Sequence, residues 1–162
     1  MSELPLLVGY AGMGELLGVH RQALVAWRSR TGYDMPVRPG LEPLPVEDLL
    51  YGDRPLWYTE HLVRWAVRNG LLAAYPGRIP APVPVCHFPE VAAMFGVSEK
   101  AVRGTWRANT LRAREGVAVP PAKTLPEPDL IPEGLALWFP VTLERWAREV
   151  GRRVSDAGRR AS

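Results

Sequence analysis

The stretch 15–30 combines side chains that can hydrogen-bond to the edges of DNA bases with the spacing of a helix. Its apolar residues, which share one helical face, are Val19, Leu24 and Trp27. The residues left pointing outward are His20, Arg21, Gln22, Val25 and Arg28. Arg and Gln pair with guanine and adenine, respectively, in the major groove of DNA. Because Gly18 supplies a turn before this helix, the stretch is typical of the turn and second helix of a helix-turn-helix.

The helices that must position these side chains are expected to be short. A first helix is predicted over 11–17, because Met13, Leu16 and Leu17 share a face. Two glycines inside it lower its helix propensity, so tertiary packing must hold it. The second helix is predicted over about 20–30.

A wing and a third helix are predicted to follow. Residues 31–55 are rich in Pro and Gly and show no sustained period, and the apolar run 55–58 is a strand candidate. Thr59 is expected to cap a third helix that ends at Gly70. A strand and a loop between two helices form the outline of a wing.

The same order of parts occurs a second time. Residues 88–97 parallel residues 10–19, and Ser98 is expected to cap a second helix that runs to about Asn109. Three later parts of the second half also match the first half. They are the Pro-rich stretch 112–134, the apolar run 136–139 and a Leu-x-x-Trp-Ala helix that ends at Gly151. This shared order supports the helix-turn-helix interpretation more strongly than either copy alone.

The repeat sets the predicted domain organisation. We expect a first winged helix-turn-helix domain over 1–72, a semi-rigid Pro-rich linker over 73–84 and a second winged helix-turn-helix domain over 85–151. Residues 152–162, with four arginines and one acid, form a basic tail that is expected to be mobile. The predicted fold class is therefore mainly α with small β wings, as two tandem winged helix-turn-helix domains.

The composition permits a nucleic-acid partner without demanding one. The chain has 162 residues, is 47% hydrophobic and 23% charged, and carries a net charge of +3, which is typical of a mildly basic globular protein. Residues 1–80 have eight Arg against eight acids, a net charge of zero, and residues 81–162 have twelve Lys+Arg against nine acids, or +3. Electrostatics alone therefore do not identify a nucleic-acid binder.

Several classes of site and location are not expected. Cys86 is the only cysteine, which excludes an intramolecular disulfide and a Cys-based metal cluster. The three histidines, His20, His61 and His87, lie far apart, and no catalytic motif stands out. We expect no metal, cofactor, small-molecule ligand or enzyme activity. The N-terminus does not resemble a signal peptide and no apolar run could span a membrane, so a cytoplasmic location is expected.

The pattern Leu-Leu-Gly-Val-x-Arg-Gln-x-Leu-x-x-Trp over 16–27, with its wing, aromatic strand and Leu-x-x-Trp-Ala helix, resembles the MerR-like winged helix-turn-helix. The most similar branch is that of the excisionase (AlpA-like) proteins of actinobacteria, their phages and plasmids. The ending of the second copy, 137–152, resembles that branch even more closely. The resemblance implies three short helices and a β wing per copy, with the second helix in the major groove and the wing against the backbone or minor groove.

The resemblance also implies candidate DNA-binding residues. In the first copy the base-facing positions are His20, Arg21, Gln22, Val25 and Arg28. In the second copy they are Ser98, Glu99, Lys100, Arg103 and Arg107. The candidates for phosphate contacts in the two wings are Arg38, Arg54, Arg112, Arg114 and Lys123.

The second copy departs from the pattern of the first. Trp106 lies ten residues after Gly96, whereas Trp27 lies nine residues after Gly18, and a glycine, Gly104, falls in mid-helix. Glu99 also occupies the place of Arg21, and a carboxylate there repels phosphates. The first copy is therefore expected to read sequence, and DNA binding by the second copy needs a test.

The expected function is sequence-specific binding of double-stranded DNA, as a transcriptional regulator that occupies an operator. Two unlike half-sites are expected, separated by about 10–10.5 bp or a multiple of this spacing. One alternative is an excisionase-like or DNA-packaging architectural accessory. The other is a protein-interaction module that kept the fold without DNA binding. Beyond DNA, a homodimer or a partner protein is possible, and the expected setting is the nucleoid or a phage-infected bacterial cell.

Overall fold

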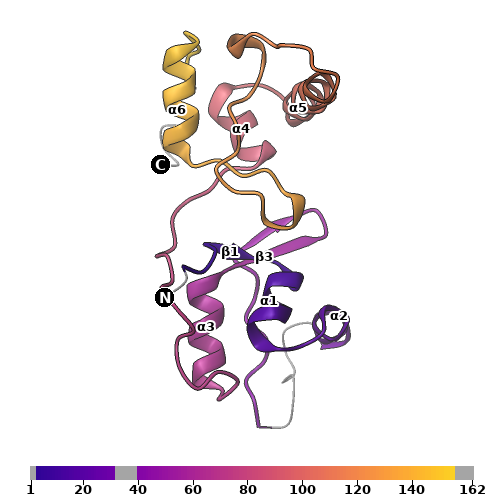
Figure 1. The fold of residues 1–162 in the computed structure, drawn as a ribbon, viewed down its shortest axis with the longest axis vertical. Helices are drawn as coiled ribbons and strands as arrows, with labels where there is room; N and C mark the ends of the chain where they lie inside the picture. Colours follow the sequence, from indigo (N-terminus) through magenta and orange to yellow (C-terminus); the bar gives the residue numbers. More distant parts are fainter. Residues whose placement is uncertain (1–2, 32–39, 156–162) are drawn as a thin grey trace. The chain divides into compact units, whose positions relative to one another are not determined.

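A computed structural model of the chain describes residues 3–31 and 40–155. The chain divides into two compact units, Met1–Val83 and Pro84–Ser162, which are called unit 1 and unit 2 here (Figure 1). The described residues are mainly helical, with one small antiparallel sheet of three strands.

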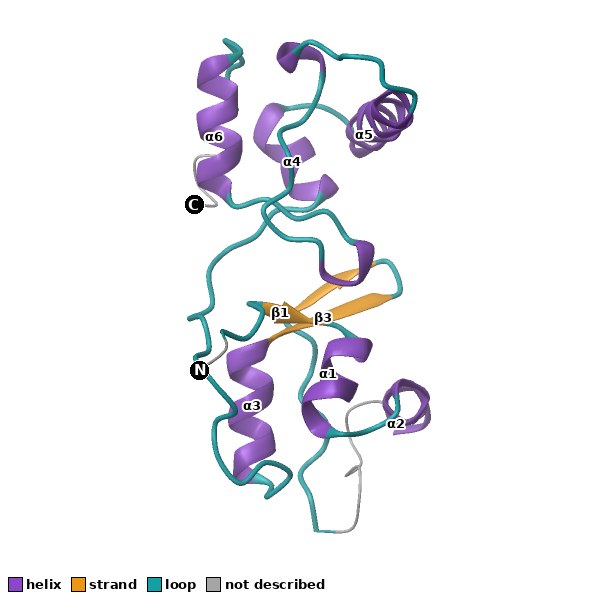
Figure 2. Ribbon diagram, in the orientation of Figure 1, coloured by secondary structure: helices purple, strands orange, loops and turns teal. Residues whose placement is uncertain are grey.

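The described residues of unit 1, 3–31 and 40–83, form three helices and the sheet. The helices are α1 (Tyr10–Leu17), α2 (Arg21–Thr31) and α3 (Thr59–Arg68). The strands are β1 (Leu7–Val8), β2 (Leu49–Tyr51) and β3 (Arg54–Tyr58). They are ordered β1-β3-β2, and helices α1 and α3 lie on the same side of this sheet (Figure 2). The core of unit 1 therefore forms where the apolar faces of the helices meet the sheet.

The glycines of α1 are explained by close packing. A Cβ on Gly12 would lie 2.9 Å from Cγ1 of Val8, and a Cβ on Gly14 would lie 2.5 Å from the carbonyl oxygen of Val19. Glycine is needed at both positions despite its cost to helix stability. Gly18 then adopts a left-handed conformation, with φ of 65°, and ends the helix so that the chain can turn into α2.

Thr59 does not cap α3, in contrast to the expectation from sequence. Tyr58 occupies the cap position, and Thr59 is the first helical residue and is fully buried. Its hydroxyl donates to the carbonyl oxygen of Pro5 at 2.5 Å, so the side chain ties α3 to the segment before β1. The hydroxyl is used for tertiary packing and not for the free N–H groups of the helix.

Nearly all of the segment predicted as a linker, 73–84, belongs to unit 1 and hydrogen-bonds to the rest of that unit. The amide of Leu4 donates to the carbonyl oxygen of Arg78, and the hydroxyl of Tyr58 donates to that of Val83. The division between the units falls after Val83. Proline-rich chain in this region is therefore held along unit 1 at two points.

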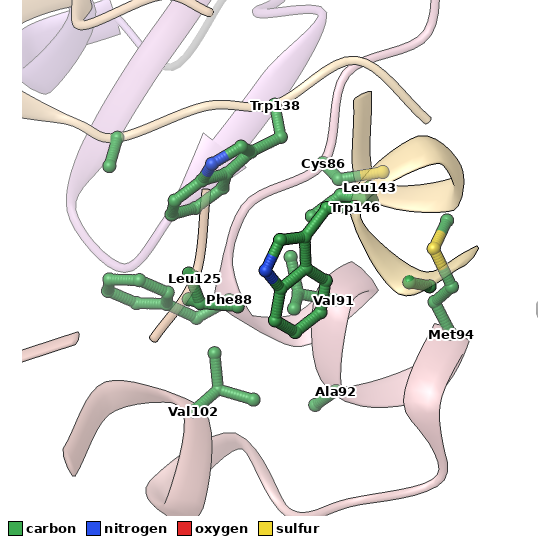
Figure 3. Close-up of a cluster of buried hydrophobic side chains, with 12 residues drawn as sticks. Cys86, Phe88, Val91, Ala92, Met94, Val102, Leu125, Trp138, Leu143 and Trp146 are labelled. Atoms are coloured by element: carbon green, nitrogen blue, oxygen red, sulfur yellow. The ribbon is translucent and has the colours of Figure 1, made fainter. Parts of the chain in front are cut away.

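Within residues 84–155, unit 2 has three α-helices and two short 3₁₀ turns. The helices are α4 (Phe88–Phe95), α5 (Glu99–Arg114) and α6 (Pro140–Glu149). The 3₁₀ turns are Pro121–Lys123 and Pro132–Gly134. Its core gathers side chains from all three α-helices around Trp138 and Trp146 (Figure 3). The indole ring of Trp138 is fully buried and lies edge-on to that of Trp106, with ring centroids 5.3 Å apart.

The two units share detailed contacts as well as element order. In unit 1, Val8 pairs with Trp57 and Leu49 with Leu56; in unit 2, the corresponding pairs are Cys86 with Trp138 and Leu130 with Leu137. The indole N–H groups of Trp57 and Trp138 each donate to a proline carbonyl, of Pro45 at 2.8 Å and of Pro126 at 2.9 Å. The internal repeat is therefore present in the packing of the two units.

Unit 2 differs from unit 1 in the length of α5 and in its strands. Helix α5 has 16 residues and α2 has 11. The predicted end near Asn109 is wrong, because no proline or glycine follows until Gly116, whose φ of 72° ends the helix. The strand predicted over 136–139 is reduced to isolated bridges, because the Pro132–Gly134 turn interrupts the segment that would pair with it.

Candidate nucleic-acid interface

Helix α5 carries positive charge on the side opposite its buried face. Lys100, Arg107 and Arg114 follow one another every seven residues, which is two helical turns, and Arg103 lies one turn from both Lys100 and Arg107. We call Lys100, Arg103, Arg107 and Arg114 the cationic stripe; all four are exposed. The buried residues of α5, Val102 and Asn109, point the other way and fix its rotation.

Three cations of the stripe are free to meet a ligand. Lys100, Arg107 and Arg114 have no hydrogen-bond or ion-pair partner among residues 3–31 and 40–155. Arg103 is different, because its Nε donates to Oε1 of Glu99 at 2.7 Å and its guanidinium lies 5.2 Å from the ring centroid of Phe88. The ion pair partly compensates the negative charge of Glu99.

The start of α5 explains two more of the predicted residues. Ser98 caps the helix, because its Oγ accepts a hydrogen bond from the amide of Ala101 at 3.2 Å. Glu99 stands in the first turn, where a carboxylate interacts favourably with the helix dipole. Both residues therefore have structural roles at the helix start.

Arg112 and Arg114 lie on α5 and not on a wing, so their placement as wing residues is wrong. The helix continues through both, and Gly116 and Val117 close it through hydrogen bonds to the carbonyls of Ala113 and Arg112. Arg114 thereby joins the cationic stripe, whereas Arg112 is exposed on the flank of the helix. Lys123 lies within the irregular stretch predicted as a wing, at the end of the Pro121–Lys123 turn.

Helix α2 presents a less charged outer face. Arg21, Gln22 and Val25 are exposed, and Arg21 has no partner in the described part of the chain. His20 precedes the helix, and its Nδ1 accepts from the amide of Gln22 at 3.3 Å. Among the side chains of α2 that the structure describes, this face therefore offers one free cation, one amide and one apolar side chain.

Arg28, predicted to face bases, is held within unit 1. Its Nη2 lies 2.8 Å from Oε1 of Glu47, its Nη1 donates to the hydroxyl of Tyr10, and only 25% of its side chain is exposed. Burial lowers the pKa of Arg28, but hydrogen bonds to Tyr10 and Glu47 outweigh it and raise the pKa overall. The guanidinium thus joins α2 to α1 and to the segment before β2.

The wings carry little positive charge. Arg54 is exposed at the start of β3, next to the Gly52-Asp53 turn, and Arg38 lies outside the described residues. The corresponding residues 130–137 of unit 2 contain Glu133 and no Lys or Arg. Ile131 is 62% exposed in that segment. Among the described residues, helix α5 and not either wing therefore provides the larger group of free cations.

Comparison of the chain with protein-family models, curated proteins and solved structures found no match. No helix within residues 3–31 and 40–155 has the length and apolar character to cross a membrane. In the same residues, no three His, Cys, Asp or Glu side chains gather as a metal site would require. Cys86 is buried, and burial followed by the charges of Glu90 and Glu144 raises its pKa to about 11, so it is no reactive thiolate.

Two features of this interface were missed by reasoning from sequence. The partner of Arg28, Glu47, lies in an irregular segment whose position no periodicity predicts. The seven-residue spacing of Lys100, Arg107 and Arg114 was present in the sequence, but the expected helix ended too early to include Arg114. Extending the helix past Asn109 to Gly116 would have revealed the stripe.

Proposed function

We propose that this chain binds double-stranded DNA through two winged helix-turn-helix modules, as a transcriptional regulator that occupies an operator with two unlike half-sites. Helix α5 of unit 2 lies in the major groove and supplies most of the charge-dependent affinity. Helix α2 of unit 1 supplies further base contacts.

The cationic stripe carries this proposal. A solvated helix usually mixes both signs of charge on its outer face, whereas the outermost line of α5 has three free cations and no acid. The 16 residues of α5 span about 24 Å at 1.5 Å per residue, so Lys100 and Arg114 can reach phosphates on both sides of a major groove about 12 Å wide. Arg107 lies between them, where a guanidinium can pair with a guanine.

The two helices are suited to different parts of recognition. On α2, Arg21 and Gln22 can hydrogen-bond to guanine and adenine, and the exposed Val25 can contact a thymine methyl group. A single free cation gives this face little sequence-independent affinity. Unit 2 is therefore the main source of affinity, and unit 1 adds discrimination between sequences.

The test removes charge from the stripe and, in a matched control, from another helix. Duplexes enriched from a random library by the full chain serve as probes. Lys100→Ala with Arg107→Ala is expected to weaken binding by at least about 100-fold at physiological salt, because two groove contacts are lost. Arg145→Ala with Arg148→Ala removes the same charge from exposed positions of α6 and is expected to change affinity by less than about fivefold.

Equal binding by both double variants would contradict the proposal, as would failure of the random library to yield any enriched duplex. Thermal unfolding of both variants shows whether the fold is kept, since all four side chains are exposed.

A further inference from the structure

We infer that Gly104 is the point at which the backbone of α5 approaches the edges of the base pairs, so that its missing side chain is a specificity determinant. This inference rests on the proposed function. It concerns how deeply the helix enters the groove, which the cations alone do not determine.

Gly104 has no structural reason to be glycine. A Cβ built on it meets no heavy atom within 4 Å, and its φ is not positive. The other glycines inside α-helices, Gly12 and Gly14, would meet neighbouring atoms within 3 Å. Glycine in an exposed helix interior is less favourable than alanine for helix stability. Neither packing nor backbone conformation within the fold therefore explains glycine at position 104, whereas a close approach to a ligand would explain it.

Gly104 lies within the outermost line of α5. It follows Lys100 by four residues and precedes Arg107 by three, so all three share one face. Leu111, 49% exposed, repeats the same spacing one step further, between Arg107 and Arg114. Along this face, Gly104 leaves a position without a side chain between the cations Lys100 and Arg107. The apolar Leu111 lies between Arg107 and Arg114. Because Gly104 has no side chain, the helix backbone there can come close to the edges of the base pairs. The long side chains of Lys100 and Arg107 can extend past it on either side.

The outer faces of the two helices differ near their centres. Counted back from the partly buried tryptophans Trp27 and Trp106, Val25 of α2 corresponds to Gly104 of α5, whereas counted from the turn glycines it corresponds to Arg103, because α5 has one residue more between its turn glycine and its tryptophan. Val25 and Gly104 both face outward. The two units therefore place a branched side chain and no side chain at the centre of their outer faces, and they should prefer different base pairs.

The test separates fold stability from DNA binding. Gly104→Ala is expected to raise the melting temperature of unit 2 by roughly 4–8 °C and to weaken binding to the enriched duplex about threefold. Gly104→Gln is expected to weaken it at least about tenfold, because a side chain occupies the space next to the base edges. Ala113 is exposed about two and a half turns further along, on the opposite side of α5, so Ala113→Gln is the matched control and should bind normally.

Binding of Gly104→Gln within twofold of the unmodified chain would overturn the inference. If Lys100→Ala with Arg107→Ala still abolished binding in that experiment, the proposed function would stand without it. If neither variant changed binding, or the unmodified chain bound no duplex, the proposed function would fail as well.

Discussion

Arg28 shows how one side chain can satisfy a sequence pattern and still serve another purpose. Its place one residue after Trp27 matches a base-facing position, but its guanidinium contacts Glu47 and Tyr10. The geometry within unit 1 makes it a side chain that holds α2 against its neighbours. Arg21, which is exposed and has no partner among the described residues, remains the arginine of that helix that we propose for base contacts.

Arg28→Ala is expected to lower the free energy of unfolding of unit 1 by about 1–2 kcal/mol, because the partly buried Glu47 loses its charged partner. Arg21→Ala should change it by less than about 0.5 kcal/mol and should weaken duplex binding instead. Urea unfolding of both variants checks the first expectation and fluorescence anisotropy the second. A stable Arg28→Ala variant that loses binding would restore Arg28 as a base-facing residue.

His87 couples the stability of unit 2 to pH. It is buried, and its Nδ1 lies 2.8 Å from the carbonyl oxygen of Ala136, to which the neutral ring can donate. Burial is the main cause that lowers the pKa of His87; Arg103 lowers it further, whereas the Ala136 carbonyl, Glu90 and Glu99 raise it. The folded state therefore favours the neutral ring.

Unit 2 is expected to lose stability as the pH falls below about 6.5, because the unfolded chain then binds a proton that the folded unit resists. Between the pKa values of His87 in the unfolded and folded states, the slope of the unfolding free energy against pH approaches about 1.4 kcal/mol per pH unit. His87→Gln can keep a hydrogen bond to Ala136 and has no titrating ring. The unfolding free energy of unit 2 in this variant should therefore fall less between pH 7.5 and 5.5 than in the unmodified chain. Urea unfolding at the two pH values measures both, and identical losses would show that other groups are responsible.

At the level of elements, an aspartate joins the irregular segment to the last helix in each unit. Oδ2 of Asp48 accepts from the amide of Tyr58 at 2.8 Å, and Oδ2 of Asp129 accepts from that of Phe139 at 2.7 Å. The second oxygen of Asp129 accepts from the hydroxyl of Thr142 at 2.9 Å. Each carboxylate satisfies an amide at the beginning of α3 or α6, where helices leave amides free.

Asp129→Ala is expected to destabilise unit 2 by about 1 kcal/mol, in the range of a lost helix cap. Asp48→Ala should destabilise unit 1 by a similar amount, since the two carboxylates make matching contacts. Glu127→Ala, at an exposed neighbouring position, is the control. Thermal unfolding gives the three values, and an unaffected Asp129→Ala variant would show that the contact contributes nothing.

The order of helices could be predicted from sequence, but several contacts could not. The helix–glycine–helix order in both units was predictable because apolar periodicity and Gly18 or Gly96 act locally. The roles of Thr59 and Arg28 depend on Pro5 and Glu47, which are distant in sequence and lie in segments without a period. Helix α5 is longer than expected, because the sequence prediction ended it near Asn109. Its additional turn places Arg114 on the cationic stripe.

At the scale of the whole molecule, the two units share a pattern of contacts and differ in surface charge. Residues 1–80 have a net charge of zero and residues 81–162 of +3, counting eight Arg against eight acids and twelve Lys+Arg against nine acids. The free cations of α5 concentrate positive charge on one face of the helix, which the net charges of the two halves do not show. Sequence alone favoured the first copy as the DNA reader, and the proposal now assigns most of the affinity to the second.

The salt dependence of binding tests this central claim most directly. For one enriched duplex, the logarithm of the association constant is measured against the logarithm of salt concentration for the unmodified chain and for Lys100→Ala with Arg107→Ala. If both side chains neutralise phosphates, the slope should become shallower by about 2 in the variant. If only Lys100 does so while Arg107 contacts a base, the change should be about 1. The Arg145→Ala with Arg148→Ala control should keep the original slope. An unchanged slope in the stripe variant would contradict the assignment of α5 to the DNA groove.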